Sequence, residues 1–274
     1  MSDPTREGTR PAGNAAGVLP LREGALPVAA IAAFVAMIAV ARLAAADPTG
    51  SRVLTAPTAW LPRAGEADAM LGIDHRSEGA AVVGYGLGGL AEIELGSETD
   101  IRAGTDETER PSPLVLGRAG FRLGARQDTG FTGMPAIVFG VRTTFAAHGH
   151  EIHQPRASDA YLVASRDLGV VRLHAGVDAL SASASGRRSA AQLRPLAGVE
   201  LHPPMYPRST LFGDIAWQPR LDAQAGPQLE WLLGIGVRYQ ALSWAAVELA
   251  VRARQAEDLG ASTVMIRLHT ALAH

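Results

Sequence analysis

The stretch Val82–Leu95 reads V-V-G-Y-G-L-G-G-L-A-E-I-E-L. After the pair Gly88-Gly89, the run Ala91–Leu95 alternates apolar residues with glutamates. Alternation with a period of two is typical of a strand that has one apolar and one polar face. The two glycines supply the positive φ angles that a tight hairpin turn needs. The stretch therefore predicts two antiparallel strands joined by a short turn.

The same layout recurs to the end of the chain. We find about a dozen alternating segments, and lengths of roughly nine to eleven residues suit a tilted strand that crosses a bilayer. The sequence therefore predicts an all-β fold, an antiparallel transmembrane up-and-down β-barrel of about 12 strands, with ten or fourteen as alternatives. The segments are Ala69–Arg76, Ala80–Leu87, Leu90–Ser97, Leu114–Ala125, Ala136–Ala147, Asp159–Arg166, Val170–Leu180, Ala191–Leu201, Thr210–Arg220, Leu229–Tyr239, Trp244–Arg254 and Ser262–Ala273.

In ten of these segments the charged residues all lie on one face. In Trp244–Arg254, for example, alternate apolar residues oppose Glu248 and Arg252. The polar face of a β-sandwich would meet bulk water, whereas a barrel lumen brings opposite charges on neighbouring strands together. We predict that the following residues line the lumen: Glu92, Glu94, Arg118, Arg122, Arg142, Arg172, Asp178, Arg194, Glu200, Asp214, Glu230, Arg238, Glu248, Arg252 and Arg267.

The connections differ in length on the two sides of the predicted barrel. With a periplasmic start, the turns at Gly88-Gly89, Asp167–Gly169 and Gln240–Ser243 are periplasmic, and longer loops lie outside. This asymmetry is typical of outer-membrane barrels. Two features run against the pattern: Pro195 interrupts a strand, and Leu272–His274 lacks the aromatic end that such barrels usually have.

The first 46 residues predict an export signal. A polar leader with several arginines precedes an apolar run, Val28–Ala41, and a small-residue site at Ala44–Ala46. These parts describe a secretory signal peptide, and the run is short for a spanning helix. We predict a signal peptide over 1–46 that is cleaved after Ala46, with an uncleaved anchor as the alternative. Residues 47–67 then form an extended periplasmic lead-in, because their prolines break any ladder, and 68–274 form the barrel in the outer membrane.

Composition excludes several classes of function. The chain has 25 Lys+Arg, 27 Asp+Glu and no cysteine among its 274 residues. The near balance of charge gives no reason to expect a nucleic-acid partner. The absence of cysteine excludes disulfides, thiolate metal sites and a cysteine nucleophile.

Two stretches resemble known outer-membrane proteins. Within Val82–Leu95, G-Y-G-L-G-G-L-A-E-I-E-L resembles the hairpin that Gram-negative outer-membrane barrels repeat. Leu54–Gly65, L-T-A-P-T-A-W-L-P-R-A-G, resembles the opening of YjbH-like and related porin-like barrels. The resemblance implies residence among outer-membrane lipid and lipopolysaccharide, and insertion by the barrel-assembly machinery. It implies no substrate.

Two exterior loops hold groups that could bind a cation. One carries three histidines and a glutamate, a set that could ligate Zn²⁺ or Ni²⁺, and the other carries carboxylates suited to Ca²⁺ or Mg²⁺. No helix fixes the spacing of the histidines, and a solvated loop explains both stretches, so we predict no metal and no cofactor. The residues are His148, His150, Glu151, His153, Ser97–Asp100 and Thr105–Glu109.

A membrane hydrolase would need a nucleophile paired with a histidine near one rim. His75 follows Asp74, and Ser181, Ser183 and Ser185 lie in another exterior stretch. No G-x-S-x-G motif accompanies them, and we predict that the protein is not an enzyme. The predicted function is a channel or transporter for small polar solutes through a charge-lined lumen. A closed barrel that acts structurally, or in envelope assembly through its exterior loops, is the alternative, ahead of a hydrolase.

Overall fold

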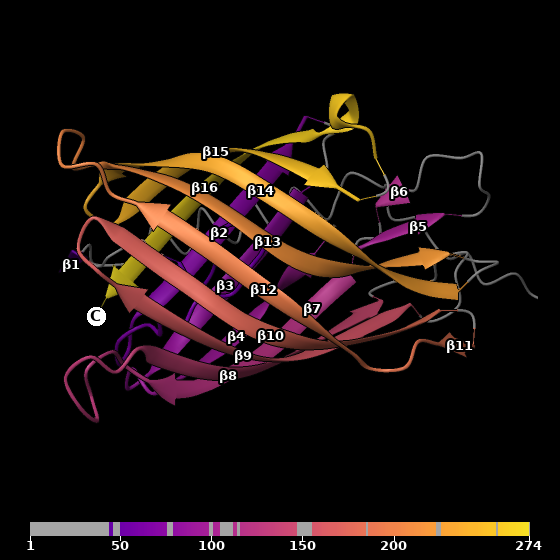
Figure 1. Cartoon of the computed structure of the whole chain (residues 1–274), viewed down its shortest axis with the longest axis horizontal. Coiled ribbons are helices and arrows are strands. Elements are labelled where there is room, and N and C mark those ends of the chain that lie inside the picture. Colours follow the sequence, from indigo (N-terminus) through magenta and orange to yellow (C-terminus); the bar gives the residue numbers. More distant parts are fainter. Residues whose placement is uncertain are drawn as a thin grey trace, which may run out of the picture.

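The computed structural model describes residues 44–45, 50–75, 79–98, 101–104, 112–113, 116–146, 155–184, 186–222, 226–255 and 257–273. Within them, 12 long antiparallel strands close into one barrel (Figure 1). The predicted fold class and strand number are confirmed. The strands are β2 (Ala67–Asp74), β3 (Gly79–Leu87), β4 (Ala91–Glu98), β7 (Leu116–Ala125), β8 (Ala136–Ala146), β9 (Arg156–Asp167), β10 (Val171–Ala184), β12 (Gln192–Leu201), β13 (Ser209–Asp222), β14 (Gly226–Leu242), β15 (Ala245–Arg254) and β16 (Thr263–Ala273).

Two pairings close the cylinder. The last strand, β16, pairs with the first, β2, and β12 pairs with both β10 and β13. Short strands lie at the two ends: β1 (Ala44–Ala45) beside β16, and β5 (Arg102–Gly104), β6 (Ser112–Pro113) and β11 (Arg187–Arg188) at the opposite end (Figure 1). Among the described residues, no helix is long and apolar enough to cross a membrane.

The strands sort their side chains as the alternation predicts. In β8, burial alternates at every residue from Ala136 to Phe145. Phe139 and Phe145 are 51% and 49% exposed on the outer face, whereas Arg142 is 9% exposed inside. A belt of exposed apolar side chains around a charged interior is stable only where lipid surrounds the cylinder, because hydrocarbon then takes the place of water. The structure is therefore that of a transmembrane barrel, which crosses the bilayer with its strands.

Tight turns gather at one end of the barrel, which we call the periplasmic end. Gly88 and Gly89 have φ angles of 75° and 69°, so they form the predicted hairpin turn. The longer connection after β7 is braced by Asp128, whose carboxylate accepts the Gly133 N–H at 2.6 Å. The other end, which carries the longer loops, is the exterior end.

Pro195 lies where the barrel wall has a seam. Its strand, β12, pairs with β13 only between Ala197 and Leu201, although it pairs with β10 along its whole length. Above that point the Pro195 carbonyl accepts the Trp217 Nε1–H at 2.9 Å. The backbone N and C=O of one strand residue point to the same side of the strand. The nitrogen of Pro195, which lacks a hydrogen, therefore points toward β13, where no strand pairing needs a donor. The seam explains how a closed barrel accommodates this residue.

Some predictions fall on residues that the structure does not describe. The predicted signal peptide over 1–46, apart from Ala44–Ala45, is one of them. The histidine-rich stretch 148–153 and most of the acidic loop also lie outside the described residues. These predictions stay predictions.

Candidate functional site

The segment Arg52–Leu61, which we call the plug, lies inside the barrel. Val53, Leu54, Thr55 and Ala56 are at most 3% exposed. The sequence predicted an extended periplasmic lead-in over 47–67, and the prolines do keep this segment out of the strand ladder. The plug does not lie in the periplasm, however, but inside the lumen. The reason is physical: the polar lumen supplies hydrogen-bonding partners for a backbone that cannot pair with a strand.

Asp214, on β13, holds the turn at the start of the plug. Its Oδ2 accepts three backbone N–H groups, from Leu54 at 3.0 Å, Thr55 at 2.6 Å and Ala56 at 2.7 Å. Successive N–H groups that converge on one carboxylate form an anion-binding nest of charge-assisted hydrogen bonds. Asp214 is 4% exposed, so water does not compete for these donors.

Arginines of the barrel wall hold the carbonyl groups of the plug. Arg238 donates to the Val53 carbonyl at 2.9 Å, and Arg267 donates to the Leu54 carbonyl at 2.5 Å. Arg122 donates to the carbonyls of Thr58 and Trp60. The wall thus binds both the donors and the acceptors of the plug backbone, from strands on several sides of the lumen.

Glycines in the wall make room for the plug. A Cβ added to Gly198 would lie 2.7 Å from Val53 Cγ2, and one added to Gly234 would collide with the Leu54 side chain. Any larger residue at these two positions would push the plug away, because backbone and plug are already in contact. The lumen therefore fits the plug in shape, through these glycines, as well as in hydrogen bonding, through its charged side chains.

A network of buried ion pairs surrounds the plug. Strand register places the partners opposite each other, as in Glu92 with Arg122 and Glu248 with Arg238. The N–O distances are 2.7 Å for Arg122–Glu92, 2.6 Å for Arg118–Glu94, 2.9 Å for Arg238–Glu200, 3.0 Å for Arg238–Glu248 and 2.8 Å for Arg254–Glu230. Arg52 of the plug joins the network through Glu94 at 2.9 Å. The network of ion pairs thus extends from the barrel wall to the plug.

Most of the predicted lumen residues are buried inside the barrel. Two have other surroundings: Arg172 is half-buried and pairs with Asp167 at 2.7 Å, and Arg194 lies over the Trp217 ring, 4.8 Å from its centroid. The residues at most 9% exposed are Glu92, Glu94, Arg118, Arg122, Arg142, Asp178, Glu200, Asp214, Glu230, Arg238, Glu248, Arg252 and Arg267.

Sequence reasoning missed several members of the network. Asp159, which accepts hydrogen bonds from Arg142, and Arg254 both follow the alternation of their strands, so the same rule could have found them. Arg52 follows no alternation, and nothing local in the sequence places it beside Glu94. Only the folded barrel brings those two together.

A buried chain of hydrogen-bonding groups lies beside the plug. Ser165 Oγ is 2.7 Å from His174 Nδ1, and His174 Nε2 is 3.7 Å from Glu200 Oε2. The Ser165 hydroxyl also accepts the Ala59 N–H at 2.7 Å and is 1% exposed. This geometry anchors the plug, and it withholds the hydroxyl from any molecule outside.

The serine and histidine residues singled out in the sequence lie elsewhere. Ser181 and Ser183 are on the outer face of β10, and Ser185 is outside the described residues. His75 is exposed at the exterior end, where its Nδ1 accepts the Val264 N–H at 3.1 Å. Among the described residues, no hydrogen bond joins His75 to these serines.

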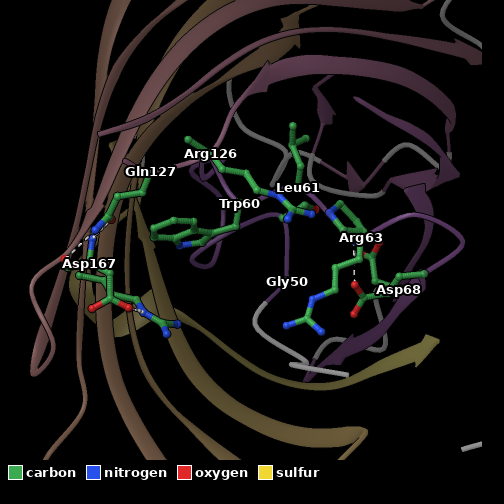
Figure 2. Close-up of a pocket in the computed structure, with 13 residues that line it drawn as sticks. Gly50, Trp60, Leu61, Arg63, Asp68, Arg126, Gln127 and Asp167 are labelled. Carbon is green, nitrogen blue, oxygen red and sulfur yellow. Dashed lines mark hydrogen bonds and ion pairs between the residues drawn. The ribbon is translucent and has the colours of Figure 1, made fainter. Parts of the chain in front are cut away.

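A pocket of about 390 Å³ opens at the periplasmic end, and the plug forms part of its wall. Figure 2 shows Trp60, Arg63, Asp68 and Arg126 around the cavity. Arg172 also lines it, and its guanidinium lies 5.8 Å from the centroid of the Trp60 ring. The pocket carries guanidinium and carboxylate groups together, so it suits a polar, charged molecule.

Comparisons with known proteins give structural likenesses only. No protein-family profile matches the chain, and no curated protein matches it, so the YjbH-like resemblance gains no support. The structure is similar to outer membrane phospholipase A from Escherichia coli (TM-score 0.42, 9% identity, 78% of this chain and 98% of that one). It is also similar to OmpT of Vibrio cholerae with loop L8 deleted (0.41, 10%, 76% and 97%). The translocator domain of the autotransporter NalP from Neisseria meningitidis is a third (0.35, 12%, 76% and 86%). At these values no property of those proteins is transferred to this chain.

Proposed function

We propose that this protein is an outer-membrane barrel whose own N-terminal segment keeps the lumen closed, and that it acts as a structural or interaction protein of the envelope. The observation that carries the proposal is the plug, which is bound at both its N–H and its carbonyl groups by buried wall residues. Between two functions predicted from the sequence, this contact favours the closed barrel over the constitutively open channel. Solutes cannot diffuse through a lumen that protein fills.

The exterior end is also filled. Ile101, from the loop after β4, is 1% exposed and packs with Leu116 and Leu221. This apolar cluster joins residues of β7, β9, β10 and β13 at the exterior end. With the lumen occupied at two levels, the surfaces left for function are the loops, the periplasmic pocket and the lipid-facing belt.

Conductance in planar bilayers tests the proposal. The wild-type protein should insert without steady current, whereas a variant that lacks residues 52–61 should conduct. Heat-modifiable migration on gels confirms that both are folded. Arg142→Glu and Arg238→Glu extend the test, because a lumen that carries current must change its ion selectivity when its lining changes sign. A steady wild-type current whose selectivity follows these two substitutions would overturn the closed barrel.

A gated channel for small polar solutes is the second candidate. The plug is joined to the wall by hydrogen bonds and ion pairs, and its departure would expose a charge-lined passage of the kind that selects solutes. The periplasmic pocket offers a place where a ligand could act on Trp60. Current that appears in the wild-type protein only after periplasmic extract is added would favour this candidate. The variant without residues 52–61 should then conduct equally with and without the extract.

A hydrolase finds least support. Ser165, His174 and Glu200 have the residue types of a catalytic triad, but the hydroxyl is buried under the plug. Esterase activity of the purified protein that disappears in Ser165→Ala would support the hydrolase over the closed barrel.

A further inference from the structure

The outer face of β8, β9 and β10 changes character in steps toward the exterior end. Strand register defines three rows of side chains across these strands. The lowest, Val141–Ala160–Ala179, is apolar, and the next, Thr143–Ser158–Ser181, carries hydroxyls. The third, Arg156–Ser183–Arg188, adds β11 and carries two guanidinium groups.

The height of these rows can be worked out from strand geometry. From Val171, at the periplasmic end of β10, to Ser181 the strand advances about 33 Å, since each residue adds about 3.3 Å. A tilt of about 40° reduces this to about 25 Å along the membrane normal, which is the height of the apolar band of such barrels. The hydroxyl row therefore marks the outer edge of the hydrocarbon. The arginine row stands about 5 Å above it, at the level of the lipid headgroups.

The third row has the form of an anion site. Arg156 and Arg188 are each directly opposite Ser183, one on either side, and both are exposed. Their backbones are two strand spacings apart, about 10 Å, so two arginine side chains can reach one group above Ser183. Among the described residues, neither arginine pairs with a carboxylate. The hydroxyl row below continues the polar surface, since Thr143 and Ser158 join through their hydroxyls at 3.0 Å.

We propose that Arg156, Ser183 and Arg188 bind the phosphate of a phosphorylated lipid in the outer leaflet of the outer membrane. Two guanidinium groups match phosphate oxygens through paired, charge-assisted hydrogen bonds, and the serine hydroxyl adds a third donor. The acyl chains of such a lipid would then lie against the apolar row and the exposed residues below it, such as Val177. This site depends on which end of the barrel faces outward, and it is independent of whether the lumen is closed.

Native mass spectrometry of the purified full chain in detergent tests the site. The probes are lipid A with both phosphates and the same lipid with its phosphates removed. The wild-type protein should bind the phosphorylated form more tightly, and the double variant Arg156→Gln/Arg188→Gln should lose about tenfold or more in affinity for it. The affinity for the dephosphorylated lipid should stay the same.

The matched control is Arg208→Gln, which removes an exposed arginine at the periplasmic end. Heat-modifiable migration shows that each variant is folded, which the outward position of the substituted side chains favours. The site is refuted if the double variant binds phosphorylated lipid as the wild type does. It is equally refuted if Arg208→Gln lowers the affinity as much, or if the wild type does not discriminate between the two lipids.

Discussion

Removal of the Asp214 carboxylate should release the plug. In Asp214→Ala, three plug N–H groups lose their acceptor. A buried donor without a partner costs about 1–3 kcal/mol, so the plugged state should lose about 3–9 kcal/mol relative to a state with the plug in water. The strand ladders do not depend on this carboxylate, so the barrel itself should stay folded. Even the lower figure corresponds to about a hundredfold change in the population of the released state.

The chain offers a simple assay because it contains no cysteine. Thr55 is 3% exposed and its hydroxyl has no hydrogen-bond partner among the described residues, so Thr55→Cys should place a silent reporter within the plug. The rate at which a water-soluble maleimide labels that cysteine then follows the released population, provided that opening is fast relative to labelling. In the Asp214→Ala background the rate should rise about a hundredfold or more. Asp214→Asn should give a smaller rise, because its carbonyl oxygen still accepts.

Asp159→Ala is the control. It removes a carboxylate that pairs with Arg142 in the lumen, and among the described residues no hydrogen bond or ion pair joins it to the plug, so labelling should remain slow. If Asp214→Ala labels no faster than its parent while heat modifiability is retained, the nest at Asp214 does not hold the plug. If both variants label equally fast, the lumen loosens as a whole and the specific contact has no special role.

Three further predictions concern other parts of the molecule. Gly234→Val should also speed labelling at the plug without loss of the folded barrel, because its side chain would occupy the space of Leu54, and labelling at the wild-type rate would contradict this contact. Arg122→Ala should lower stability to urea by about 3–5 kcal/mol, since it leaves Glu92 buried without its charge partner; an unchanged unfolding midpoint would show that the pair contributes little. Hydrogen bonds from the Gly133 N–H and from Gln127 lower the pKa of Asp128 below its ordinary value of 3.8. This loop contact therefore stabilises the folded state at pH values above 3.8, and the stabilisation is lost as the pH falls through the lowered pKa. Proteolysis of the loop after β7 should therefore quicken below about pH 4, and Asp128→Asn should remove that pH dependence.

Local regularity explains how much of the wall could be predicted from the sequence. Alternation depends on neighbouring residues alone, so the outward Phe139 and the inward Arg142 of β8 could be assigned before any pairing was known. Glycines mark turns for a reason equally local, as the positive φ angles of Gly88 and Gly89 confirm. The charged partners could be placed on one face, although only register decides which carboxylate meets which arginine.

The sequence by itself determined the wall of this protein: twelve amphipathic strands, the side of each that meets lipid, and the turns that join them. The tertiary structure alone decided what fills the cylinder. Leu54 meets Asp214 across 160 residues, and Arg267 reaches the same plug residue across 213. The proline of that segment predicts only that the segment does not pair as a strand. A contact between residues far apart in the chain produces no periodic pattern in the sequence, so the position of the segment could not be predicted. Its destination became visible only when closure of the barrel brought buried charges from several strands around it.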